Sequence, residues 1–146
     1  MSAIGIVGSE EAKFSPLGKE RACEIIRRLL TAPGVESIIS GGCHLGGIDK
    51  WAAEIGMELE LNVTEYLPKT LTWTEGYKPR NLLIAGRSDA VHCITVKQYL
   101  PEYRGMRFKM CYHCGTDTHI KSGGCWTMKQ AIQMGKPGHI HIVDNL

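Results

Sequence analysis

The sequence predicts an α/β protein in which a mainly parallel β-sheet is covered by helices on both faces. Short apolar runs alternate with amphipathic stretches along all 146 residues, and Gly, Ser or Pro residues separate them. Neighbouring parallel strands need a crossover connection, which is usually a helix, so this alternation is typical of a three-layer arrangement. The length suits one hydrophobic core, and we expect a single domain over residues 1–146.

The elements follow from the spacing of apolar residues. The strands are expected as short Ile- and Val-rich runs at residues 3–7, 37–39, 61–66, 90–96 and 139–143. The helices are expected at residues 16–30, 48–59, 79–85 and 126–134. The first helix has Ser15 at its N-cap and Pro16 at its first position, both favourable there. Residues 97–121 break the alternation and are interpreted as an insertion.

Composition excludes several classes of protein. With 43% hydrophobic and 22% charged residues, the chain is neither disordered nor a membrane protein. A net charge of +2 does not by itself indicate a nucleic-acid binder. The sequence shows no signal peptide and no apolar run near the roughly 20 residues of a membrane span, so we expect a cytoplasmic protein without a membrane partner. The six cysteines would then stay reduced rather than form disulfides.

Glycine-rich loops follow the first and second strands and precede the last helix. Residues 40–49 contain four glycines within seven positions, which is more than a tight turn needs. Such loops let backbone N–H groups approach an anion at a helix N-terminus, and the carboxyl ends of parallel strands meet at one edge. The candidate ligand-binding residues in these loops are Gly8, Ser9, Ser40, Gly41, Gly42, Gly47, Asp49, Gly123, Gly124 and Thr127. Asp49 is either a helix cap or a ligand of a ribose hydroxyl.

A cysteine–histidine cluster lies at the end of the insertion. Its expected metal ligands are Cys111, Cys114, His119 and Cys125. The spacing Cys-x2-Cys-x4-His-x5-Cys is that of a zinc knuckle with one extra residue in the last spacer, and it predicts a structural zinc site with four protein ligands. The substitute ligands are His113, Cys43 and His44. The remaining thiols and imidazoles are expected to be core or edge residues, namely Cys23, Cys93, His92, His139 and His141.

Taken in order, these segments resemble the SLOG superfamily of Rossmann-like proteins. That superfamily groups DNA-processing protein A with the LOG-type nucleotide phosphoribohydrolases, and the likeness is greatest to its small YspA-like members. The matching residues are Val7-Gly8-Ser9, Ser40-Gly41-Gly42 with Gly47 and Asp49, Arg80-Asn81, Ser88 to Val91, Gly123-Gly124 with Thr127, and Gly135 to Pro137. The resemblance implies a Rossmann-like fold and a nucleotide or nucleotide-derived ligand across the loops. It also implies that Arg80, beside Asn81, is a phosphate-facing cation, and that the chain forms homo-oligomers.

One departure from the LOG-type pattern bears on catalysis. The LOG-type loop Gly-Gly-x-Gly-Thr-x-x-Glu has Trp126 in place of a glycine and Gln130 in place of the glutamate. An amide cannot act as a general base or carry the charge that stabilises an oxocarbenium-like centre. No catalytic residue is therefore assigned. Other acids that could act are Asp49, Glu75 and Asp89.

The expected function is binding of a nucleotide-like small molecule, in sensing or in a process related to nucleic acids. One alternative is a nucleoside-phosphate glycosidase. Another is a nucleic-acid-binding module, because aromatic and basic residues interleave in the insertion and its spacing is knuckle-like. Packing of those aromatic residues against the core is the simpler interpretation. Trp73 and Tyr77 are expected either to cover the base ring of a ligand or to form a dimer contact.

Overall fold

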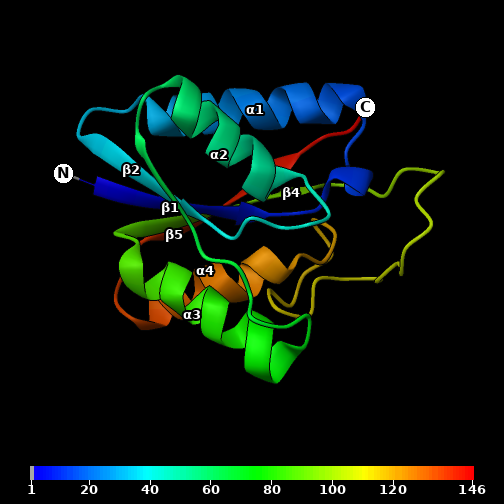
Figure 1. The fold of residues 1–146 in the computed structure, drawn as a ribbon. Coiled ribbons are helices and arrows are strands. Elements are labelled where there is room, and N and C mark those ends of the chain that lie inside the picture. Colours follow the sequence, from blue (N-terminus) through cyan, green and yellow to red (C-terminus); the bar gives the residue numbers. More distant parts are fainter. Residues whose placement is uncertain (1) are drawn as a thin grey trace.

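A computed structural model describes residues 2–146 and contains a five-stranded, all-parallel sheet between two layers of helices (Figure 1). The predicted α/β fold class is confirmed, and the arrangement is that of a Rossmann-like sandwich. The strand order is β3-β2-β1-β4-β5. The strands are β1 (Ser2–Gly8), β2 (Val35–Ser40), β3 (Asn62–Glu65), β4 (Ala90–Val96) and β5 (Gly138–Val143).

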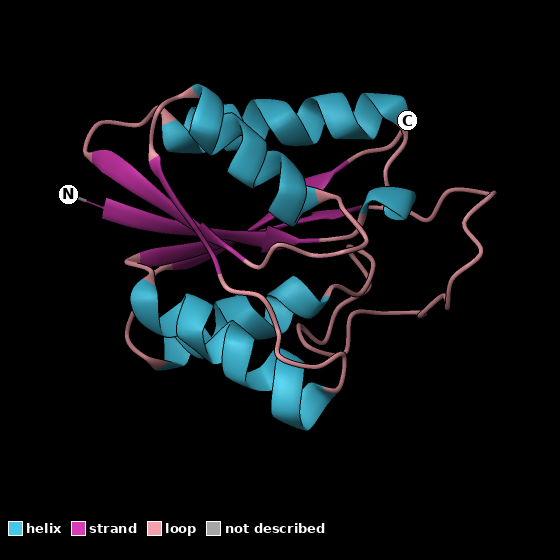
Figure 2. Cartoon of the chain, viewed as in Figure 1, coloured by secondary structure: helices cyan, strands magenta, loops and turns pink. Residues whose placement is uncertain are grey.

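Helices cover both faces of the sheet (Figure 2). One layer holds α1 (Pro16–Leu30) and α2 (Ile48–Glu58), and the other holds α3 (Lys78–Arg87) and α4 (Gly123–Gln133). Two short helical segments, η1 (Glu11–Lys13) and η2 (Trp73–Tyr77), precede α1 and α3. The start of α1 follows the sequence signals, since the Ser15 hydroxyl accepts a hydrogen bond from the Gly18 amide and Pro16 opens the helix.

Each face of the sheet has its own core. The core under α1 and α2 contains Ile6, Ile38 and Ile94, all fully buried, together with an edge-to-face pair of Phe14 and Trp51 at 5.0 Å. The core under α3 and α4 includes thiols beside its aliphatic side chains. Its cysteines are Cys93, Cys111 and Cys125. The insertion is therefore packed into the second core through its cysteine cluster.

The last helix begins earlier than the sequence pattern indicated. It starts at Gly123 instead of residue 126, because the Ser122 hydroxyl accepts a hydrogen bond from the Gly124 amide and caps the helix. The glycine pair thus forms the first turn of α4 rather than a loop before it. Residues 97–121 are irregular, as expected of an insertion, apart from one isolated bridge between Cys111 and Thr116.

The switch point of the sheet lies between β1 and β4. The chain leaves β1 toward α1 on one face and leaves β4 toward the insertion and α4 on the other (Figure 1). The carboxyl ends of these two strands therefore border an opening, which is the usual binding position in open α/β sheets. Across residues 2–146, every helix is too short or too polar to span a bilayer.

Candidate ligand cavity and metal centre

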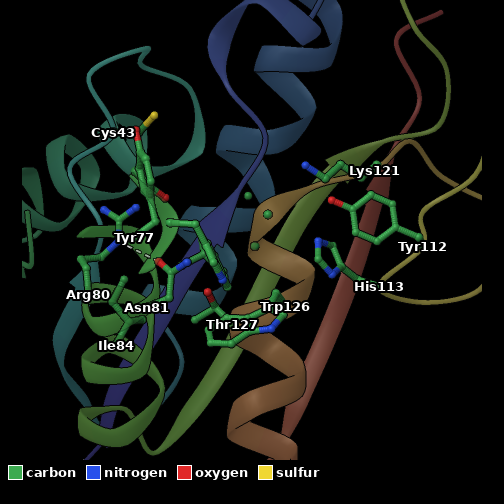
Figure 3. A pocket seen from close by; sticks show the side chains of 16 residues that line it. Cys43, Tyr77, Arg80, Asn81, Ile84, Tyr112, His113, Lys121, Trp126 and Thr127 are labelled. Atoms are coloured by element: carbon green, nitrogen blue, oxygen red, sulfur yellow. Dashed lines mark hydrogen bonds between the residues drawn. The ribbon is translucent and has the colours of Figure 1, made fainter. Parts of the chain in front are cut away.

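A cavity of about 570 Å³ opens at this carboxyl edge. Its volume suits a small-molecule ligand. The lining comes from the end of β1, the loop after β2, η2, α3, the insertion and the first turns of α4 (Figure 3). The predicted ligand-binding residues among the lining are Gly8, Asp49, Arg80, Asn81, Gly123, Gly124 and Thr127.

The four expected metal ligands converge beside this cavity. The ligand atoms of the set all lie within 4.8 Å of one another, and the set consists of Cys111, Cys114, His119 and Cys125. Three thiols and one imidazole at this separation could hold a metal ion in a tetrahedral site. The substitutes His113, Cys43 and His44 are not part of the cluster.

The turn between the first two cysteines has the form that the spacing predicts. The Cys111 carbonyl accepts hydrogen bonds from the amides of Cys114, at 3.2 Å, and of Gly115, at 2.8 Å. Gly115 has a φ of +68°, a conformation that only glycine adopts without strain. The chain then returns, and the Cys111 amide donates to the Thr116 carbonyl at 2.9 Å. Both thiols therefore project from one tight loop.

His119 is oriented as a metal-binding histidine. Its side chain is 2% exposed, and its Nδ1 lies 2.8 Å from the Ile120 carbonyl, to which it can only donate. In the neutral ring this leaves the lone pair on Nε2, which is buried and has no partner among the described residues. A backbone acceptor on one ring nitrogen that frees the other for a cation is the usual support of a metal-binding imidazole.

The thiols crowd one another. Burial and the neighbouring Cys125 raise the pKa of Cys114 to about 12. The pKa of Cys125 is raised by its contact with Cys93, whose Sγ lies 3.7 Å away, and by burial. Burial also raises the pKa of Cys111, but backbone N–H donors from Cys114 and Ser122 outweigh this and lower it overall. A divalent cation would stabilise all three thiolates.

Arg80 is held in place by the chain itself. The side chain is 8% exposed, and its guanidinium lies 5.4 Å from the centroid of the Tyr77 ring. Its Nε donates to Asn81 Oδ1 at 2.7 Å, and its Nη1 donates to the carbonyls of Gly41 and Tyr66. No hydrogen bond among residues 2–146 uses Nη2, so two N–H donors of a fixed cation remain for a ligand.

Asp49 is the acidic residue of the cavity wall. It lies in the first turn of α2 and is 7% exposed, and its Oδ1 has no partner among the described residues. Burial raises the pKa of this carboxyl to about 6, against the opposing effects of the Arg80 cation and the Cys43 amide. A carboxyl with a raised pKa at a cavity wall is a candidate functional group.

The N-terminus of α4 meets the cavity on the opposite side. Gly123 and Gly124 form the first turn, Thr127 follows in the next, and Lys121 precedes the helix. Gly124 approaches β1 so closely that a Cβ there would lie 2.9 Å from the Gly8 nitrogen. This contact fixes the first turn of α4 against β1, where the helix dipole favours an anion.

The other predicted ligand-binding residues are not on the cavity wall. The Ser9 hydroxyl is buried 2.7 Å from Thr95 Oγ1, and the Ser40 hydroxyl donates to the Asp49 carbonyl. Gly41 supplies a carbonyl to Arg80, while Gly42 borders a smaller neighbouring cavity of about 200 Å³. Gly47, with a φ of +87°, lies against the backbone of residues 9–11. These residues support the wall rather than form it.

Several lining residues were not predicted as site residues. They are Ile84, Tyr112, Lys121 and Trp126, while His113 and Cys43, which were expected only as substitute metal ligands, also line the cavity. The rings of Trp73 and Trp126 meet edge to face, with centroids 4.8 Å apart. Tyr112 and His113 lie between Cys111 and Cys114 in the sequence. Their position could have indicated them, because the turn that positions the two thiols also positions the two side chains between them. Trp73 and Tyr77, expected at a base ring or a dimer contact, both line the cavity.

The remaining predicted acids lie elsewhere, and only part of the aromatic–basic stretch reaches the cavity. Asp89 accepts a hydrogen bond from the Ala3 amide at the opposite edge of the sheet, and neither Glu75 nor Gln130 lines the cavity. Within the insertion, Arg107 lies over the Tyr99 ring, and Lys121 lies over the rings of Phe108 and Tyr112. Tyr99 packs against the core under α1 and α2, whereas Tyr112 is exposed and lines the cavity.

No protein-family model matches this chain. The comparisons with curated proteins and with solved structures gave no match either. The function must therefore be inferred from the cavity and the metal centre.

Proposed function

We propose that the chain binds a nucleotide, or a phosphate ester derived from one, in the carboxyl-edge cavity. The proposal includes membership of the SLOG superfamily, whose loop order the sequence resembles. It also includes a structural zinc ion bound by Cys111, Cys114, His119 and Cys125. The observation that carries it is that a buried arginine and a helix N-terminus border one cavity whose other walls are aromatic.

Phosphate recognition rests on the charged and dipolar groups of the cavity. The first turn of α4 and Lys121 provide positive potential on one side. The free Nη2 group of Arg80 provides two oriented donors on the other. Asp49 could accept a hydrogen bond from a ribose hydroxyl or a base N–H. A phosphate ester with a polar sugar would pair with the cationic groups through its phosphate and with Asp49 through its hydroxyl groups.

Base recognition rests on the aromatic walls. Trp73, Trp126, Tyr77 and Tyr112 line the cavity, and Trp73 is 46% exposed although it is one of the largest apolar side chains. Aromatic faces that remain accessible at a polar cavity are suited to stacking on a nucleobase. The aromatic rings would therefore hold the base while the helix N-terminus and the cations hold the phosphate.

Zinc is proposed because of the donor set. Three thiolates and one imidazole match a structural zinc site, and soft thiolate ligands disfavour Mg²⁺ and Ca²⁺. The buried, unpartnered Nε2 of His119 would gain a partner on binding the ion. Four protein ligands leave no open coordination position, so the ion would organise the insertion and take no part in chemistry.

The binding proposal is tested by titrating the zinc-loaded protein with nucleoside 5′-monophosphates and with inorganic phosphate. Arg80→Met is expected to weaken nucleotide affinity by about 10- to 100-fold, the value of a charged hydrogen-bonding group. Lys121→Met tests the opposite side without removing hydrogen bonds from the β2 loop. Arg87→Met is the control, because Arg87 is exposed at the far end of the same helix. Absence of saturable binding, or equal affinity in all variants, would contradict the proposal.

Asp49 favours a second candidate function, hydrolysis of the N-glycosidic bond of the bound nucleotide. A buried carboxyl with a pKa of about 6 suits a general base. Water oxygen would bond to the anomeric carbon and give a proton to Asp49, while the bond to the base breaks and the base takes up a proton from solvent. Release of free base by wild-type protein but not by Asp49→Asn would support this candidate. Binding without release of base would leave only the binding function.

A further inference from the structure

Three histidines form a cluster on the sheet, away from the cavity. His92 lies in β4 and is paired in register with His139 of β5, and His141 lies two residues farther along β5. Side chains alternate along a strand, so His139 and His141 share one face. His92 lies on the same face, because it is paired directly with His139. Ile94 and Val96 follow on this face of β4 and pack in the core under α1 and α2.

The rings are in direct contact. His92 Nδ1 lies 2.9 Å from His141 Nε2 in a hydrogen bond. The His92 ring stacks on the His139 ring at a centroid distance of 5.0 Å and on the His141 ring at 5.2 Å. His92 and His141 are partly buried and His139 is exposed, so the cluster is fixed at its base and open to solvent at its edge.

The surroundings of His92 and His141 favour their neutral form. Burial, and then the neighbouring imidazoles, lower the pKa of His92 to about 4. Burial, His139 and the Arg28 guanidinium of α1 also lower the pKa of His141. A neutral imidazole keeps one nitrogen lone pair, which is the form that binds metal ions. Acidic side chains are not among the groups that affect either ring.

We propose that His92, His139 and His141 bind a divalent transition-metal ion of the imidazole-preferring kind, such as Zn²⁺, Ni²⁺ or Cu²⁺. The hydrogen-bonded nitrogens of His92 and His141 are already at about the separation of two ligands on one ion. The ring that donates this hydrogen bond moves its proton to its other nitrogen, and the ion takes the proton's place. The exposed His139 supplies the third nitrogen by rotating its side chain.

This centre differs from the cysteine centre in its chemistry. Three nitrogen ligands leave at least one coordination position for water or a small ligand, whereas four protein ligands close the site. Its position also differs, because His92 and His139 lie in the first halves of β4 and β5, and none of the three histidines lines the cavity at the carboxyl edge. The proposal is thus independent of the proposed function.

Ni²⁺ is the probe, because it prefers imidazole to the thiolate set that zinc already fills. Zinc-loaded protein is titrated with Ni²⁺ at pH 7.5 by calorimetry, and released zinc is followed with a chromogenic indicator. We expect one equivalent of Ni²⁺ to bind without release of zinc. His139→Ala and the double variant His139→Ala/His141→Ala should weaken binding by at least about tenfold. His44→Ala, which removes an exposed histidine outside the cluster, should leave it unchanged.

Three results would overturn the proposal. They are no Ni²⁺ binding, equal affinity in the wild type and both variants, and release of one zinc for each Ni²⁺ bound. Thermal unfolding of each variant verifies that it is folded. The single variant His139→Ala keeps the test decisive if the double variant is unstable, because His139 is exposed and its removal disturbs no core contact.

Discussion

The two walls of the cavity are built in different ways. The β2 wall, formed by Cys43, Asp49 and Arg80, is held by the chain's own hydrogen bonds, such as those from Arg80 to the Gly41 and Tyr66 carbonyls. The knuckle wall, residues 111–125, has no strand and no helix before Gly123, and its turns converge on four side chains that could hold a metal ion. Hydrogen bonds within the chain hold the first wall, whereas the second wall would depend on a metal ion bound to those four side chains.

This difference assigns separate tasks to the two glycine-rich segments, which look alike in sequence. Behind the β2 wall the polar groups hydrogen-bond within the protein. The Ser40 hydroxyl donates to the Asp49 carbonyl, and the Gly41 carbonyl accepts a hydrogen bond from Arg80. In the knuckle wall the glycine pair opens a helix whose N-terminus meets the cavity. The two walls should therefore respond to different perturbations.

Metal removal should produce the largest effect, and only through the knuckle wall. Cys111→Ser is expected to abolish stoichiometric zinc and to weaken nucleotide binding at least tenfold, because Tyr112 and Lys121 lose their positions. The free energy of zinc binding contributes to folding, so we expect the Tm to fall by about 10 °C or more, equivalent to a few kcal/mol at this size. Elemental analysis, calorimetry and thermal unfolding measure the three effects.

Cys23→Ser is the matched control, because Cys23 is a partly buried thiol of α1 outside the cluster. It should keep its zinc and its nucleotide affinity. If a chelator removed the metal from wild-type protein and left both the Tm and the nucleotide affinity unchanged, the dependence of the knuckle wall on the ion would be wrong.

The β2 wall should instead respond to pH through Asp49. Its pKa is about 6 in the folded protein, above the usual 3.8, so folding favours the protonated form. Stability is then greatest below about pH 4 for this group and is lost as pH rises through 6, by up to about 3 kcal/mol. Asp49→Asn should remove this loss and be more stable than wild type at pH 7.

Urea unfolding between pH 4.5 and 7.5 checks this expectation. Glu54→Gln is the control, because Glu54 is an exposed acid of the same helix. Parallel pH profiles of wild type and Asp49→Asn would show that the buried carboxyl is not held in its neutral form.

Adjacent glycines in the knuckle wall offer a matched pair. A Cβ at Gly124 would lie 2.9 Å from the Gly8 nitrogen and 3.0 Å from Cys93 Sγ, whereas a Cβ at Gly123 would meet nothing within 4 Å. Gly124→Ala should cost about 1–3 kcal/mol because β1 or α4 must shift. Gly123→Ala should be neutral or stabilising by up to about 1 kcal/mol, as alanine favours a helix. Chemical denaturation compares the two, and equal losses would contradict the close contact at Gly124.

The order of the elements and the cluster of Cys111, Cys114, His119 and Cys125 could be predicted, because both follow from local patterns. The apolar runs marked all five strands, and the turn of Cys111 and Cys114 is a consequence of four consecutive residues and Gly115. Helix boundaries were harder. The cap at Ser122 competes with the apolar spacing that begins at Trp126, and the cap determines where α4 starts.

Side-chain directions at the sheet edge could not be predicted, because they depend on contacts between distant segments. Ser9 turns toward Thr95, 86 residues away, instead of toward the cavity. The three histidines were expected to be packed or edge residues rather than ligands. Only the register of β4 on β5 places His92 beside His139, and a shift of one residue would turn one ring to the other face.

The smallest expected effect compares two helix caps. Ser122 caps α4 at the knuckle wall, and Ser15 caps α1 in the other layer. Ser122→Ala and Ser15→Ala should each cost about 1 kcal/mol in urea unfolding. Only Ser122→Ala should also weaken nucleotide affinity, by about two- to fivefold, because fraying of the first turn of α4 removes part of the dipole that meets the phosphate. If Ser15→Ala weakened binding as much, the loss would reflect general stability and not the N-terminus of α4.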